Sequence, residues 1–136
     1  MKVSKLKKTL GFTLIELLIV IVIMGLLMSL VAPAMFSKVG SSKQKTAAAQ
    51  MQMLSTALDT HLLDTGNYPS ALEELRKSTA SGWDGPYLPR DIPMDPWGNS
   101  YEYSTPGTEG NPYALKTLGR DGKPGGEGED EDIIYQ

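Results

Sequence analysis

Residues 11–36, GFTLIELLIVIVIMGLLMSLVAPAMF, decide the fold of this chain. Between Phe12 and Phe36 the only ionisable side chain is Glu16, near the start. As an α-helix this stretch would span roughly 37 Å, which exceeds the roughly 30 Å hydrocarbon core of a bilayer. The alternative, a buried helix of a soluble domain, needs a large protein shell on every side, which the polar remainder of the chain cannot supply. Residues 12–36 therefore predict a membrane-spanning helix.

Charge and composition divide the rest of the chain. The 136 residues leave room for one small domain beside the apolar stretch. Residues 1–11 form a basic leader, and basic residues next to an apolar span favour a cytoplasmic N-terminus and export of the C-terminal part of the chain. The exported part is acidic and has no basic stripe, which disfavours nucleic acid as a partner. The chain has no cysteine, so disulfides do not hold the exported part together.

The order of the N-terminal segments differs from that of a secretory signal peptide, in which a short apolar core precedes a small-residue cleavage site. Here Gly11 stands before the apolar stretch, so cleavage after it would keep the helix in the product. A charged residue such as Glu16 costs on the order of 2.5 to 3.5 kcal/mol near the membrane centre and less towards the interface. Cleavage would create a free amine on Phe12 at nearly the same depth. We expect Glu16 of one subunit to pair with this amine of a neighbour; the alternative is solvation of Glu16 by headgroups.

Residues 37–65 are polar but keep a helical period. Their apolar residues form a single stripe, and Gly66 is placed to end the helix: Ala47, Met51, Leu54, Leu58 and Leu62. These residues predict an amphipathic continuation of the membrane helix, which the glycine and serines at 40–42 could loosen. We expect the only histidine, His61, at the helix surface or the edge of the core. The intervening polar residues should mostly face away from the head: Lys43, Gln44, Lys45, Gln50, Gln52, Ser55 and Asp59.

Residues 66–136 predict a small head. Ser70 and Glu73 have the spacing of a capping box and predict a short helix over 71–77. Residues 78–99 are rich in proline and glycine and predict an irregular loop, whose Trp83 and Trp97 should fill the core rather than form a carbohydrate platform. Residues 100–104 and 112–118 alternate as strands do, and 133–135 could add a third. The expected fold is α+β, with the long helix packed on a small antiparallel sheet.

Residues 119–132, GRDGKPGGEGEDED, are rich in glycine and carboxylates. Alone they would form a solvated, disordered tail. The apolar residues 133–135 could instead pin the far end to the sheet and close a loop. Asp121 and the acidic residues 127–132 would then offer only oxygen ligands, which suit Ca²⁺, although the spacing of an EF-hand is absent. The residues alone leave the tail and the calcium site equally open.

Residues 11–16, GFTLIE, resemble the prepilin cleavage motif of type IV pilins and of the pseudopilins of type II secretion. The head resembles the major pseudopilins, which have a pilin-like fold, in four segments: TGNYP (65–69), WDGPYL (83–88), DPWGN (95–99) and the run 118–133. Type IV major pilins usually close the C-terminal region with a disulfide, and this chain departs from them because it has no cysteine.

The resemblance implies roles for particular residues. A membrane-embedded prepilin peptidase would cut after Gly11 and methylate the amine of Phe12, and Glu16 would be required for assembly. Pro33, with Gly25 and Ser29, matches positions where pilins loosen the helix inside filaments; a tolerated kink in an ordinary membrane helix is the alternative. In the acidic loop the resemblance implies one structural Ca²⁺, although Gly128 falls where some relatives have an aspartate. The implied ligands are the Leu118 carbonyl, Asp121, Asp130 and Asp132.

No nucleophile–base pair, histidine metal set or phosphate loop is visible in the sequence, so we do not expect an enzyme. The resemblance implies a structural subunit of the periplasmic pseudopilus, a helical filament that helps to drive export of folded proteins. Its partners would be its own copies, the prepilin peptidase, minor pseudopilins and an inner-membrane assembly platform. It would cross the inner membrane once, with the head in the periplasm. The alternatives are a type IV pilin or competence pseudopilin, and a membrane-anchored calcium-binding module that never polymerises.

Overall fold

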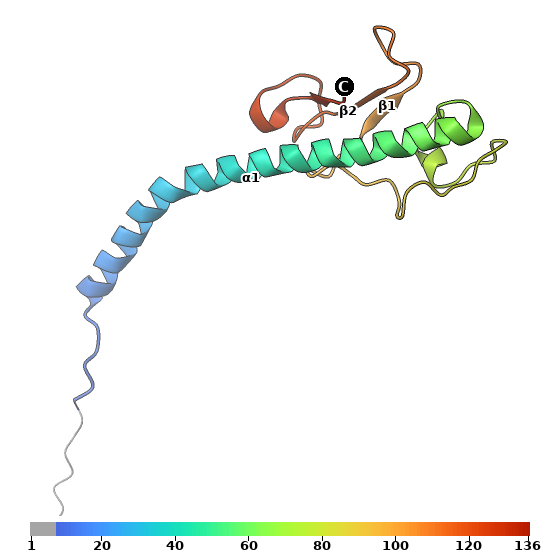
Figure 1. Ribbon diagram of the computed structural model, residues 1–136. Coiled ribbons are helices and arrows are strands. Elements are labelled where there is room, and N and C mark those ends of the chain that lie inside the picture. The colour runs from blue at the N-terminus through green and yellow to red at the C-terminus, as the bar shows by residue number, and fades with distance from the viewer. Residues whose placement is uncertain (1–7) are drawn as a thin grey trace, which may run out of the picture. The chain divides into compact units, whose positions relative to one another are not determined.

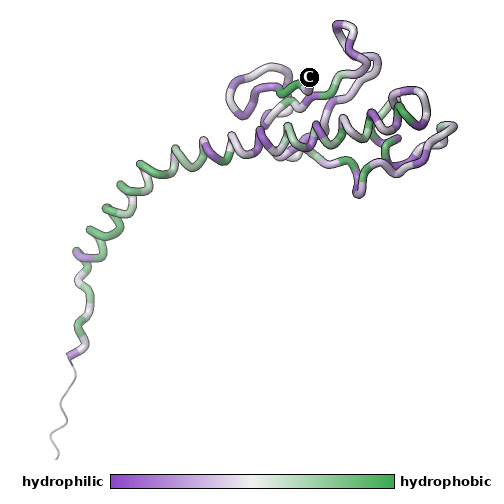
Figure 2. The backbone as a smooth tube through the Cα atoms, in the orientation of Figure 1, coloured by the Kyte–Doolittle hydropathy of each residue, from purple (hydrophilic) through white to green (hydrophobic). Residues whose placement is uncertain are grey.

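The computed structural model describes residues 8–136, so residues 1–7 of the predicted leader lie outside the described part. The chain forms two units, one ending at Ser37 and the other spanning Lys38–Gln136. A single helix, α1 (Leu14–Thr65), runs through both (Figure 1). Its first half is almost uniformly apolar (Figure 2). It is the one helix in the described residues that is long and apolar enough to cross a membrane.

In the single chain, α1 is α-helical through Gly25, Ser29 and Pro33, and loosening of these residues inside filaments stays a prediction. Pro33 lies inside the helix, and the Ser29 hydroxyl, one turn earlier, donates to the Leu26 carbonyl at 2.7 Å. Residues 40–42, where the helix could have loosened, are α-helical as well. The reason is local packing, since Gly40 is buried against the head. Gly66, at φ +81°, ends the helix as predicted, and its N–H donates to the Leu62 carbonyl at 2.8 Å.

The core of the Lys38–Gln136 unit is built on the apolar stripe of α1. The stripe is confirmed for its first four residues, but Leu62 is only half-buried and His61 is buried in its place. The Nδ1 atom of His61 lies 2.8 Å from the Asn67 carbonyl. Against the stripe pack leucines and a tyrosine from the rest of the head: Leu72, Leu75, Leu88, Tyr101 and Leu115.

Two expectations about the segment after α1 are wrong. The short helix is a single 3₁₀ turn, η1 (Leu72–Leu75). A 3₁₀ helix has three residues per turn, so Leu72 and Leu75 lie on the same face of it and both reach the core. Its N-cap makes no side-chain bond, and the Ser70 hydroxyl donates to Glu74 rather than capping the turn with Glu73. The tryptophans do not fill the core either. Trp83 is half-buried at its edge, where the indole N–H donates to the Glu74 carbonyl at 2.8 Å.

The sheet has the three predicted strands, each shorter than expected: β1 (Glu102–Ser104), β2 (Ala114–Thr117) and β3 (Ile133–Ile134). The order is β1-β2-β3 and both pairs are antiparallel. β2 turns Leu115 and Thr117 inward, and the sheet lies along one side of the second half of α1 (Figure 1). The Tyr135 N–H donates to the Leu115 carbonyl at 2.9 Å, so the C-terminal residues do pin the acidic loop to the sheet. The predicted α+β fold is confirmed.

Tyrosine hydroxyls fasten the head to the helix at polar residues of α1 that were expected to face away. Tyr113 donates to Ser55 at 2.8 Å, Tyr68 to Asp59 and Tyr135 to Gln52, each at 3.1 Å, and Tyr101 to Gln50. That expectation is therefore wrong for these four helix residues. They flank the apolar stripe, where a long side chain at the rim of the head can reach them. Burial is the largest cause of a raised pKa at Tyr68 and Tyr113.

Candidate functional site

The predicted cleavage site lies just before the start of α1. Residues 8–13 have no regular secondary structure, and Gly11 has no neighbouring atom within 4 Å of where a Cβ would stand. The Phe12 side chain is 88% exposed. The peptide bond between them therefore lies in an open, non-helical segment, which is the kind of segment that proteases cut. This geometry is compatible with cleavage after Gly11, which stays a prediction.

Glu16 forms a capping box with Thr13 at the start of α1. The Glu16 N–H donates to the Thr13 hydroxyl at 3.3 Å, and the Thr13 N–H points back to Glu16 Oε2 at 3.5 Å. This role of Thr13 was not predicted from the sequence. A Thr-x-x-Glu pattern directly before an apolar run is the signal that could have revealed it. The carboxylate thus has a long contact to a donor in its own chain and retains acceptor capacity for another donor.

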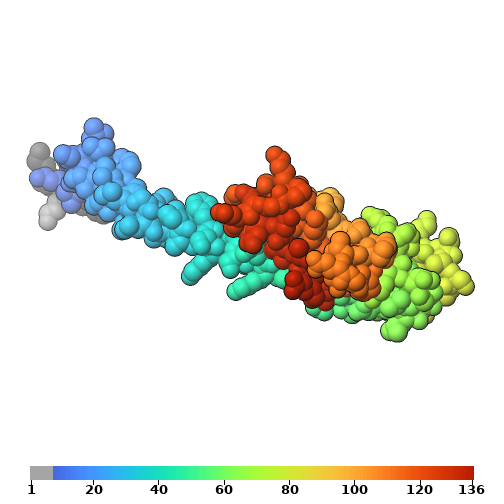
Figure 3. All heavy atoms as spheres, turned by 90° about the horizontal axis from the view of Figure 1, so that it is seen from above, coloured from blue at the N-terminus to red at the C-terminus, as the bar shows by residue number. Residues whose placement is uncertain are grey.

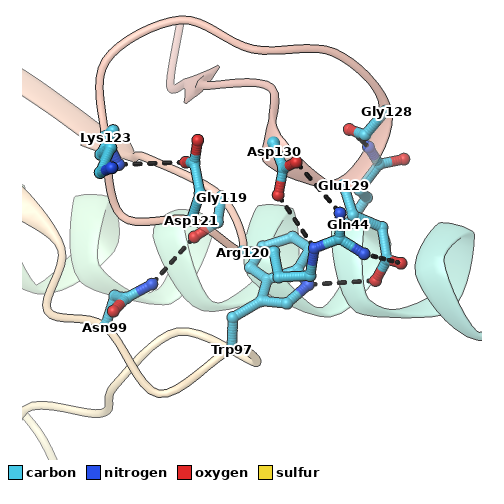
Figure 4. Close-up of polar contacts among 10 residues, drawn as sticks. All are labelled: Gln44, Trp97, Asn99, Gly119, Arg120, Asp121, Lys123, Gly128, Glu129 and Asp130. Carbon is cyan, nitrogen blue, oxygen red and sulfur yellow. Dashed lines mark hydrogen bonds and ion pairs between the residues drawn. The ribbon is translucent and has the colours of Figure 1, made fainter.

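The acidic loop begins at a fixed point on the sheet. Leu118 is buried, and the carbonyl of the next residue, Gly119, accepts a bond from the Asn99 side chain at 2.9 Å (Figure 4). Asp121 is exposed, and its Oδ1 accepts the Lys123 N–H at 3.0 Å. Within the loop lies a short 3₁₀ turn, η2 (Gly128–Asp130). The structure therefore places two of the predicted ligands, Leu118 and Asp121, at the start of the loop.

Asp130 is held by an arginine of the same loop. Arg120 Nε and Nη2 donate to the two oxygens of Asp130 at 2.9 and 3.0 Å, and its Nη1 lies 3.5 Å from Glu129 Oε2 (Figure 4). The hydrogen bonds from Arg120 hold the pKa of Asp130 below its usual range, and those to Asp130 raise the pKa of Arg120. The loop therefore contains its own cation. The predicted ligand set includes carboxylates of this loop and does not consider Arg120 as their partner. The position of Arg120 within the acidic segment is the signal that could have suggested this pairing.

The donor set fits a calcium ion in part. Asp132 Oδ1 is buried and has no hydrogen-bond partner, which suits an oxygen that awaits a cation. Asp130, in contrast, already has a cationic partner in Arg120. Within residues 8–136, no three acidic or histidine side chains are grouped as a metal cluster. The three implied carboxylates thus lie in one loop, but in the described residues they are not grouped around a single point.

Comparison with known proteins places the chain in two steps. Residues 6–32 match the model of the prokaryotic N-terminal methylation motif, and this range includes the open Gly11–Phe12 segment and the first turns of the apolar helix. Residues 34–136 match the family of type II secretion system protein G. The chain belongs to this protein G family.

Relatives and a solved structure agree with this assignment. The chain is 40% identical over 131 residues to the type II secretion system core protein G of Pseudomonas aeruginosa, with 90% of this chain and 92% of the relative covered. It is 37% identical to the protein of the same name from Vibrio cholerae, over 96% and 93% of the two chains. The crystal structure of the major pseudopilin from the type 2 secretion system of enterohaemorrhagic Escherichia coli matches with a TM-score of 0.52 and 25% identity. That match covers 69% of this chain and 86% of the other.

Proposed function

We propose that this chain is a non-catalytic structural subunit that polymerises through α1 into the pseudopilus of a type II secretion system. One observation carries the proposal: each large apolar side chain of residues 14–36 is at least 50% exposed, on every side of the helix. A helix that is apolar all round needs lipid before assembly and other copies of itself afterwards. The names of the relatives and of the matching pseudopilin structure support the same role.

The proposed topology rests on the charges that flank this helix. The chain crosses the inner membrane once, with the basic leader in the cytoplasm and the head in the periplasm. A prepilin peptidase removes residues 1–11 and methylates Phe12. Minor pseudopilins and an inner-membrane assembly platform are the remaining partners. Mass spectrometry of the chain from membranes should show a methylated Phe12 at the N-terminus, and an intact Met1 would contradict the assignment.

Glu16 is the residue proposed to pair with the Phe12 amine of a neighbouring copy. Two substitutions separate this role from the capping box. Glu16→Gln keeps an oxygen that can accept the Thr13 N–H but removes the charge, whereas Glu16→Leu removes both. Both variants should insert in the membrane, and both should lose filaments when the protein is overexpressed with its assembly machinery. Normal filament yield from Glu16→Leu would refute the pairing, and normal yield from Glu16→Gln alone would assign Glu16 to helix capping instead.

We also propose that the head binds one structural Ca²⁺ through the Leu118 carbonyl, Asp121 and Asp132, with Asp130 available only if it leaves Arg120. The buried, unpartnered oxygen of Asp132 supports this proposal. A ligand that binds only the folded state stabilises it by about 2.7 kcal/mol at a hundredfold excess over its dissociation constant. Melting the chain in micelles with calcium and then with a chelator should therefore give different midpoints. Identical midpoints would exclude a structural calcium site.

A further inference from the structure

Glu129, in the acidic loop, packs directly on the backbone of α1 at Gly40. A Cβ atom at position 40 would lie 2.8 Å from both Cγ and Cδ of Glu129, closer than such atoms approach in proteins. The glutamate stem therefore occupies the space that any larger residue at position 40 would fill. In Figure 3 the red C-terminal residues lie against the turquoise turns of α1.

The Glu129 carboxylate lies between two donors. Its Oε1 accepts the Trp97 indole N–H at 3.1 Å, and its Oε2 lies 3.5 Å from Nη1 of Arg120 (Figure 4). One turn along α1 from Gly40, the Gln44 side-chain amide donates to the Gly128 carbonyl at 2.8 Å. Three segments that are distant in sequence thus meet at one point. They are the turn of α1 over residues 40–44, the DPWGN turn (95–99) and the acidic loop.

We propose that Gly40, Gln44, Trp97, Arg120 and Glu129 form a latch that fastens the acidic loop to α1 and closes without a metal ion. Arg120 supplies the positive charge of the latch, through its contacts with Glu129 and Asp130. The latch also supports residues 40–42, whose glycine and serines form helices poorly on their own. The loop and this turn of α1 therefore open and close together. The latch does not depend on whether the chain forms filaments, and it uses none of the three ligands proposed for calcium.

Hydrogen exchange of the full chain in detergent micelles with a calcium chelator tests the latch. The reporters are the Arg120 N–H, which donates to the Glu129 carbonyl at 2.8 Å, and the amides of residues 40–44. Both should stay protected in the wild type after chelation. Arg120→Gln should speed exchange of both by about threefold to tenfold, since it removes three charge-assisted contacts. Lys123→Gln is the matched control, because it also removes one positive charge from the acidic loop. Lys123 forms no ion pair in the described residues, so this variant should leave the exchange rates of both reporters unchanged.

Gly40→Ala provides an independent test, because the latch predicts faster amide exchange where helix propensity alone predicts slower exchange. Replacement of a helical glycine by alanine normally slows exchange, as expected for Gly25→Ala, where a Cβ would meet nothing within 4 Å. At position 40 the new Cβ must displace Glu129, so the Arg120 amide should exchange faster. Slower exchange in the helix with an unchanged loop would overturn the proposal. So would a wild-type chain in which chelation alone opens both reporters as far as Arg120→Gln does.

The amide of Tyr135, which bonds the Leu115 carbonyl, controls for unfolding. It should remain protected in every variant, because it reports on the sheet and not on the latch. If Arg120→Gln exposes this amide as well, that variant has unfolded the head, and Gly40→Ala then decides between the two outcomes.

Discussion

Asp95 tests how a head without disulfides is held together. The residue is only 4% exposed, yet its carboxylate has three donors. Oδ1 accepts the backbone N–H groups of Trp97 and Asn99 at 3.0 and 2.8 Å, and Oδ2 accepts the Thr117 hydroxyl at 2.6 Å. Because Asn99 in turn holds the Gly119 carbonyl, Asp95 ties the DPWGN turn both to the end of β2 and to the start of the acidic loop. We expect Asp95→Ala to destabilise the whole head.

The expected magnitude depends on the donors that the substitution leaves unpaired. A buried donor without a partner costs about 1–3 kcal/mol, and a hydrogen bond to a charged group contributes about 1.5–3 kcal/mol. The Thr117 hydroxyl is fully buried, whereas Trp97 and Asn99 are half-buried and their amides can reach water in part. Asp95→Ala should therefore lower the free energy of unfolding by about 3–5 kcal/mol. Asp95→Asn keeps one acceptor oxygen and should cost less, about 1–2 kcal/mol.

Chemical denaturation of the full chain in micelles, followed by tryptophan fluorescence, measures the change. Asp91→Ala is the matched control, because the Asp91 side chain is fully exposed and lies 3.7 Å from its one partner, Arg76. It should leave the transition unchanged. If Asp95→Ala unfolds within about 0.5 kcal/mol of the wild type, the size of a change at an ordinary surface site, the carboxylate does not hold the turn.

Further expectations concern the core, one tyrosine and the end of α1. Leu58→Ala, at a fully buried position, should cost about 2–5 kcal/mol in the same assay, whereas Leu63→Ala, at a side chain that is 83% exposed, should have little effect. Burial raises the pKa of Tyr103 to about 12, above its ordinary value of about 10, so its contribution to stability is present below pH 10 and is lost as the pH rises towards 12. The difference in ultraviolet absorbance between the wild type and Tyr103→Phe, followed with pH, would show this, and ionisation of Tyr103 near pH 10 in the folded state would contradict it. Gly66→Ala should cost about 1–2 kcal/mol through its φ of +81° alone, because a Cβ there meets no atom within 4 Å. An unchanged melting midpoint would show that the helix end relaxes.

The periodicity of the sequence was enough to predict the helix, the core stripe and the three antiparallel strands. Periodicity could not predict the polar contacts of α1. A helical period shows which side of the helix is buried, but not whether a polar residue beside the apolar stripe contacts the head or faces solvent. Ser55 shows the difficulty. It looks like a solvent-facing residue, yet it is buried because Tyr113 reaches over the rim of the head to donate to it. Such contacts depend on where a distant loop comes to lie.

The acidic loop exposes a second limit of sequence reasoning. The composition of the loop shows that oxygen ligands are abundant, but it does not show which carboxylate forms an ion pair with Arg120. That choice is made by the backbone turns of the loop. Gly126, at φ +97°, lies so close to Asp130 that a Cβ would come within 2.5 Å of its carbonyl oxygen. A residue-by-residue transfer of ligands from a family cannot capture this packing, which turns Asp130 towards Arg120.

The capping box gives a physical reason for the proposed cleavage and assembly residues to be neighbours. Thr13 caps α1 from a position beyond the predicted cut, so removal of the leader would leave the helix start intact. Cleavage after Gly11 would, however, place a new ammonium group on Phe12 at the positive end of the helix dipole, where a cation is unfavourable. A carboxylate in the first turn offsets that charge, and Glu16 holds this position. The amine then has two candidate partners, the Glu16 of its own chain and that of a neighbour. If Glu16 pairs with the amine of a neighbour as proposed, a subunit that enters the filament would exchange the first partner for the second without exposing an unpaired charge to lipid.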